Sequence, residues 1–72
     1  MDLVLSGHAL QRMATRGITE SDIVALIRSC PKPRRDAKDN PIYYGFVRGW
    51  VVQVVIAKAS HPLRVITVKV TK

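Results

Sequence analysis

The chain has 72 residues, which is enough for one small domain (1–72) but not for two. Hydrophobic residues make up 47% of it, which excludes the composition of a disordered protein, and its longest apolar run is too short to span a bilayer. The formal net charge of +7 favours a polyanionic partner, namely RNA, DNA, an anionic membrane or an acidic protein, over a basic protein without such a partner.

The first predicted helix covers residues 7–16, after an apolar stretch at residues 1–5 that is either an extended lead-in or a packed arm. Ser6 can cap the first turn by accepting a backbone N–H bond, and Gly17 suits the left-handed residue that ends a helix. Apolar residues at helical spacing line one side. Another side carries an imidazole and two permanent cations at intervals of four residues, His8, Arg12 and Arg16.

A second helix is predicted over residues 20–29, with almost no linker after the first. Thr19 is its cap, and Asp22, three residues later, can complete a capping box. Pro31 stops this helix. The two helices are therefore expected to form a tight corner.

A polar loop punctuated by prolines follows at residues 31–41. It carries four cations within seven residues, Lys32, Arg34, Arg35 and Lys38. This loop is either a solvated segment or a mobile arm that contacts phosphates.

Three strands are predicted at residues 42–48, 50–57 and 63–70, joined by short connections. Short connections favour an antiparallel meander, and two helices that precede the strands indicate an α+β class. The expected architecture is two N-terminal helices packed on a three-stranded antiparallel sheet. Tyr43, Tyr44, Phe46 and Trp50 are interpreted as core residues, although they could also stack on bases, and Gln53 is expected on the open side of the sheet or at its rim.

The last strand alternates, which leaves the direction of Thr67 open. One set of side chains contains Ile66, Val68 and Val70, and the other contains Val65, Thr67 and Lys69. If the second set faces inward, Thr67 falls beneath the first helix, and we favour this arrangement.

Cellular location is inferred from two signals. Cys30 is the only cysteine and is interpreted as a buried, inert thiol, which fits a reducing compartment. The chain does not begin with the charged and apolar segments of a signal peptide, so the expected location is the cytoplasm.

His8, Arg12 and Arg16 have the chemistry needed to cleave an RNA backbone. An imidazole can transfer protons near neutral pH, and guanidinium groups suit phosphate oxygens. His8 would move a proton at the ribose 2′-OH or at the leaving oxygen, while the arginines would stabilise the charge of the phosphate. No metal or other cofactor is needed. From spacing alone, the alternative is a basic face that is merely solvated.

The segment from Gly7 to Glu20, followed by a basic loop and three strands that end in Val65-Ile66-Thr67-Val68, resembles a family of small bacterial domains of unknown function. That family carries a His-Ala-x-x-Arg-Met-x-x-Arg-Gly-Ile helix and is grouped with the barnase, EndoU, colicin and RelE-like ribonucleases, many of which are toxins.

The resemblance implies a RelE- or barnase-like fold with a site formed by the first helix and the last strand. His8 would be the proton-transfer residue, Arg12 and Arg16 the phosphate ligands, and Thr67 a hydroxyl group in the same cleft. Lys69 stands where many members have tyrosine. Lysine can bind phosphate but does not donate like a phenol, so this difference bears on catalysis.

Three hypotheses follow from the sequence. The first is a small RNA-targeting protein that acts as a metal-independent, toxin-like endoribonuclease. The second is a nucleic-acid-binding module without catalysis, with cations in the loop and at Lys69 as contacts. The third is a protein-interaction domain, which either pairs through a sheet edge or binds an acidic antitoxin or immunity protein. The expected oligomeric state is a monomer or a weak homodimer.

Overall fold

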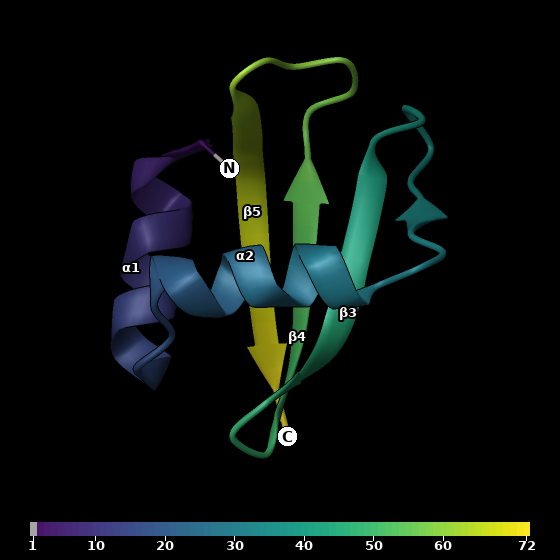
Figure 1. Cartoon of the computed structure of the whole chain (residues 1–72). Coiled ribbons are helices and arrows are strands. Elements are labelled where there is room, and N and C mark those ends of the chain that lie inside the picture. The colour runs from purple at the N-terminus through teal and green to yellow at the C-terminus, as the bar shows by residue number, and fades with distance from the viewer. Residues whose placement is uncertain (1) are drawn as a thin grey trace.

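The α+β class is confirmed by a computed structural model that describes residues 2–72. Figure 1 shows α2 lying across one face of the sheet and α1 beside β5. The elements in chain order are β1 (Leu3–Leu5), α1 (Gly7–Arg16), α2 (Glu20–Ser29), β2 (Arg34–Arg35), β3 (Pro41–Val47), β4 (Trp50–Ile56) and β5 (Leu63–Thr71).

The sheet has five strands in the order β1-β5-β4-β3-β2, so the prediction of a three-stranded antiparallel sheet is wrong. The three predicted strands form its antiparallel centre. The lead-in supplies β1, which runs parallel to β5 with Leu3 opposite Leu63. The basic loop supplies β2, whose Arg34 pairs with Ile42. Both added strands satisfy backbone groups that the edges of a three-stranded sheet would leave unpaired.

Both helices begin and end where the sequence predicts. The Ser6 hydroxyl accepts a 3.0 Å bond from the N–H of Ala9, and Gly17 ends α1 with a φ of 67°. At α2, the N–H of Asp22 donates to the Thr19 hydroxyl while the Asp22 carboxylate accepts from the N–H of Thr19, which completes the capping box. These caps fix the corner between the helices.

An irregularity in β5 changes the direction of its side chains. Val55 of β4 pairs with Thr67, but the next residue, Ile56, pairs with Val65, so Ile66 is an extra residue. As a result, Val65 and Val68 are both buried although they belong to different alternating sets. The arrangement in which Thr67 follows Val65 inward is therefore wrong, because it assumes an unbroken period of two.

The hydrophobic core lies entirely between the helices and one face of the sheet. Ala9 and Met13 of α1 and Ile23 of α2 contribute to it, together with buried valines of β4 and β5. Leu26 Cγ and Cδ1 lie 3.5 and 3.6 Å from the position that a Cβ of Gly45 would occupy, which shows that α2 packs closely on β3.

The opposite face, which we call the open face, is not covered by either helix within residues 2–72. Its side chains follow from the pairing register, because paired residues point to the same side. They are Ile42, Tyr44 and Phe46 of β3, Val51, Gln53 and Val55 of β4, and Thr67, Lys69 and Thr71 of β5. Gln53 thus points where the sequence analysis expected it.

An ion pair connects the turn between β3 and β4 to the helical corner. Arg48 donates through both terminal nitrogens to the Asp22 carboxylate, at 3.1 and 2.9 Å, and it also donates to the carbonyl of Gly17. The Arg48 hydrogen bonds, together with the N–H of Thr19, lower the pKa of Asp22 from 3.8 to about 2. Because the pKa is lowered in the folded state, this stabilisation is complete above about pH 4 and is lost as the pH falls through 2.

We predict that Arg48→Ala lowers the midpoint of thermal unfolding by several degrees at neutral pH, and by clearly less at pH 2, where about half of the Asp22 carboxylate is protonated in the folded wild-type protein and the ion pair is correspondingly weakened. Circular dichroism at the two pH values measures this. Lys58→Ala is the matched control, because the Lys58 ammonium lies 3.9 Å from an exposed Asp39 carboxylate and should contribute little. A loss for Arg48→Ala that is the same at both pH values would contradict the assignment.

Candidate nucleic-acid interface

The α1 helix presents its predicted basic side to solvent. His8, Arg12 and Arg16 are all exposed, while Ala9 and Met13 on the adjoining side are buried. Arg16 lies in the last turn, where the dipole of the helix favours a cation. Arg12 and Arg16 line one small cavity, together with Thr15 and Val70 of β5. The structure therefore brings the two predicted phosphate ligands together, beside the last strand.

Trp50 extends this arrangement at the start of β4. The guanidinium carbon of Arg16 lies 5.2 Å from the centre of the Trp50 ring, and the ammonium of Lys72 lies 4.9 Å from it. Two cations therefore share one aromatic ring, within the distance of a cation–π interaction. We call Arg12, Arg16, Trp50 and Lys72 the Trp50 cluster.

The Trp50 cluster has an unbalanced positive charge. The ion pairs within residues 2–72 involve Arg35, Arg48 and Lys58, and none involves a cation of the cluster. Neighbouring cations that form no ion pair repel one another, and an anion placed among them would reduce that repulsion. Arginine is also the side chain best suited to bidentate contact with phosphate oxygens.

Thr67 does not lie in the cavity that Arg12 and Arg16 line. Its side chain is on the open face, opposite Val55, and it lines a hollow with Ile66 and Lys38. The cavity of Arg12 and Arg16 does not include Thr67. Two predicted parts of the catalytic site, the arginines and the hydroxyl, thus line different cavities.

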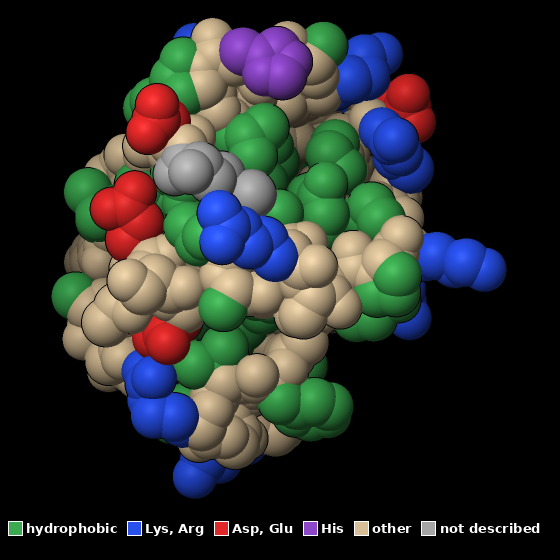
Figure 2. All heavy atoms as spheres, in the orientation of Figure 1, with side chains coloured by type: hydrophobic (Ala, Val, Ile, Leu, Met, Phe, Trp, Pro, Cys, Tyr) green, Lys and Arg blue, Asp and Glu red, His purple; other side chains and the backbone are tan. Residues whose placement is uncertain are grey.

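Asp36 orders the basic loop by hydrogen bonds within it. Its carboxylate accepts bonds from the backbone N–H groups of Lys38 and Asn40, at 2.9 and 2.8 Å, and from the Asn40 amide, and these bonds lower its pKa. Because β2 pairs with β3 as the last strand of the sheet, this segment presents its cations along one edge of the sheet. Figure 2 shows Lys and Arg side chains gathered over β2 and its loop on the right of the view.

The loop cations and Lys69 border the open face. The guanidinium of Arg34 lies 5.2 Å from the centre of the Tyr44 ring, and the carbonyl of Lys32 accepts a long bond from the Tyr44 hydroxyl. Lys69 points to the same face, opposite Gln53. Arg35 instead lies 3.9 Å from the Asp39 carboxylate.

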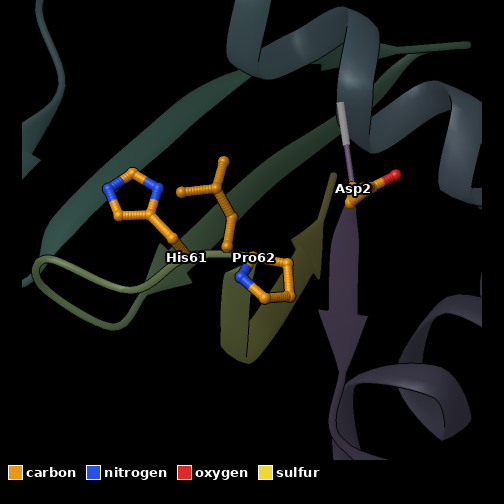
Figure 3. Close-up of a pocket in the computed structure, with 4 residues that line it drawn as sticks. Asp2, His61 and Pro62 are labelled. Atoms are coloured by element: carbon orange, nitrogen blue, oxygen red, sulfur yellow. The ribbon is translucent and has the colours of Figure 1, made fainter.

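A separate hollow at the other end of β5 has no evident chemistry. It is lined by Asp2, His61, Pro62 and Leu63. The His61 ring and the Asp2 carboxylate lie on opposite sides of Pro62 and point away from each other (Figure 3). Among residues 2–72, no three His, Cys, Asp or Glu side chains group as a metal site would require.

Four members of these surfaces were missed or misinterpreted from the sequence. Phe46 and Tyr44 are not core residues, since 81% and 41% of their surfaces are exposed. The signal was present in the alternation of β3, which turns Tyr44 and Phe46 to the side opposite Tyr43. Trp50 and Lys72 gave no signal as partners of Arg16, because only the folded sheet brings them to α1.

Comparison with known proteins places the chain in a family. Residues 5–69 match the DUF4258 family, described as a domain of unknown function, and the chain belongs to this family. Neither the curated proteins nor the solved structures give a match. None of the helices within residues 2–72 has the length and apolar character needed to cross a membrane.

Because Trp50 is the only tryptophan, its emission reports directly on the cluster. We predict that inorganic pyrophosphate changes the fluorescence of Trp50 in a saturable manner by drawing Arg16 and Lys72 away from its ring. Arg16→Ala should weaken this response at least several-fold. Arg28→Ala removes an equal charge on α2 and should leave it unchanged, and an equal effect of the two substitutions would contradict a specific anion site.

Proposed function

We propose that this protein binds RNA and that the Trp50 cluster contacts its phosphates. The observation that carries the proposal is that Arg16 and Lys72 lie over one ring while Arg12 lines a cavity with Arg16, and none of the three is in an ion pair within residues 2–72. Phosphate groups neutralise such a cluster and release the counterions that otherwise surround both molecules.

Two further observations support RNA as the partner. The formal charge of +7 on 72 residues gives a field that attracts polyanions over a distance. The motif of α1 resembles that of proteins grouped with the RelE- and barnase-like ribonucleases, which act on RNA. The resemblance extends to the order of two helices followed by strands.

Binding has stronger support than cleavage. Cleavage as inferred from the sequence needs His8 and Thr67 at one phosphate, whereas Thr67 lies on the open face and lines a different cavity from Arg12 and Arg16. His8 nevertheless remains exposed, one helical turn before Arg12. This position favours metal-independent cleavage with His8 as the proton-transfer residue as a second candidate function.

We predict that the affinity for RNA falls steeply with salt, because each phosphate contact releases counterions. For a single strand, the slope of log K against log salt should become shallower by about 0.7 for each contact removed, and so by about 1.4 in Arg12→Ala/Arg16→Ala. Fluorescence anisotropy of a labelled oligonucleotide across a salt series measures both quantities.

The control for that prediction is Arg28→Ala/Lys58→Ala, which removes two cations that do not belong to the Trp50 cluster. Both double variants lower the formal charge equally, so a general field effect would reduce affinity to the same extent in the two proteins. A larger loss in Arg12→Ala/Arg16→Ala supports the cluster. Equal losses, or binding independent of salt, would refute it.

The cleavage candidate is tested with the same protein incubated with total RNA in EDTA. Products with 2′,3′-cyclic phosphate ends that disappear in His8→Ala would support proton transfer by His8. Intact RNA at equimolar protein would exclude cleavage and leave the binding function standing.

A further inference from the structure

The open face carries aromatic and apolar side chains that a water-facing sheet seldom displays. Phe46 is 81% exposed and Tyr44 is 41% exposed, and Ile66 at the irregularity of β5 is exposed to the same extent as Tyr44. Val51 and Val55 on β4 are only partly buried. An exposed patch of this kind on a small protein marks a surface that binds another molecule.

The side chains of the open face form three rows across the strands. Phe46, Val51 and Thr71 form one end row, and Ile42, Val55 and Thr67 form the other. The middle row contains Tyr44, Gln53 and Lys69, and the Arg34 guanidinium lies over the Tyr44 ring. An aromatic ring, a carboxamide and two cations are thus set side by side across the sheet.

We propose that the open face binds the bases of single-stranded RNA. The inference rests on the proposed RNA-binding function and adds the state of the strand and the surface that receives its bases. Unpaired bases stack on exposed aromatic rings, whereas the bases of a duplex are already stacked against one another. One base stacks on Phe46, and a second stacks on the Arg34 guanidinium where it covers Tyr44.

The spacing of these two positions suits consecutive bases. Tyr44 and Phe46 are two residues apart on one strand, so their side chains are separated by about 6.8 Å, which matches an extended strand whose bases are spread apart. Thr67, Thr71 and Gln53 add hydrogen-bonding groups to the same face. Hydroxyl and amide groups can pair with the ribose 2′-OH, which is why we assign RNA and not DNA.

The open face and the Trp50 cluster meet at the end of β5. Thr71 points to the open face, while its neighbour Lys72 lies over the Trp50 ring on the side of the helices. A strand that stacks its bases on Phe46 can therefore place its phosphates beside Lys72 and Arg16 without leaving the molecule. A protein partner is the competing occupant, but the cations that border this face favour a polyanion.

The test compares Phe46→Ala with Leu10→Ala, since Leu10 is a half-exposed apolar residue on α1 and its truncation controls for general effects. The probes are labelled oligoadenylate, the same strand paired with oligouridylate, and oligodeoxyadenylate. Phe46→Ala should weaken single-stranded RNA binding about 5- to 150-fold, which is the effect of losing one stacked base. Phe46→Trp should preserve the affinity for single-stranded RNA. The affinity for the duplex should be the same in Phe46→Ala, Phe46→Trp and Leu10→Ala as in the wild-type protein.

Equal affinities of Phe46→Ala and Leu10→Ala for oligoadenylate would overturn the inference. It would also be overturned if the wild-type protein self-associates and Phe46→Ala abolishes this association but leaves RNA binding intact, because the open face would then bind a second copy of the protein. Equal binding of oligoadenylate and oligodeoxyadenylate would overturn the assignment to RNA. If Arg12→Ala/Arg16→Ala weakens binding but Phe46→Ala does not, the proposed function stands and this inference fails. If the wild-type protein binds no RNA at low salt, the proposed function itself fails.

Discussion

Two helices of ten residues cannot cover both faces of a five-stranded sheet, and the rest of the structure depends on this shortage. A chain of this length buries only about 60% of the surface that it exposes when unfolded. The fold concentrates that burial on one side, where Ile23 of α2 belongs to the same buried cluster as Val52 and Val54 of β4. The corner that positions α2 is held by the capping box at Thr19 and by the ion pair of Asp22 with Arg48.

The uncovered side then needs a different solution. The strands need residues that favour β-structure, yet the side chains on this face meet water or a ligand. Polar groups and cations therefore alternate with aromatic rings along the open face. The irregularity at Ile66 belongs to the same solution, because it buries both Val65 and Val68 while it turns Thr67 and Lys69 outward. Polar and aromatic side chains suited to binding can therefore occupy the open face while the buried residues of the core stay in place.

Local signals were sufficient to predict the helices and the three long strands from the sequence. Caps such as Ser6 and Gly17 act over a few residues, so they can be identified without the fold. The pairing of β1 and β2 could not be predicted, because segments of three and two residues have no periodicity. The prediction of the direction of the Thr67 side chain was wrong because one extra residue in β5 reverses the alternation of side chains. The Trp50 cluster joins residues from three distant parts of the chain, and only topology brings them together.

The central claim is that the uncovered face of the sheet, together with the end of β5, receives single-stranded RNA. The most direct measurement is nuclear magnetic resonance of the labelled protein during titration with oligoadenylate. The account predicts that the ring signals of Phe46, the side-chain amide of Gln53 and the indole N–H of Trp50 shift together, while signals of α2 such as Ala25 stay in place. Shifts confined to α2, or a titration that leaves Phe46 and Gln53 unmoved, would contradict it.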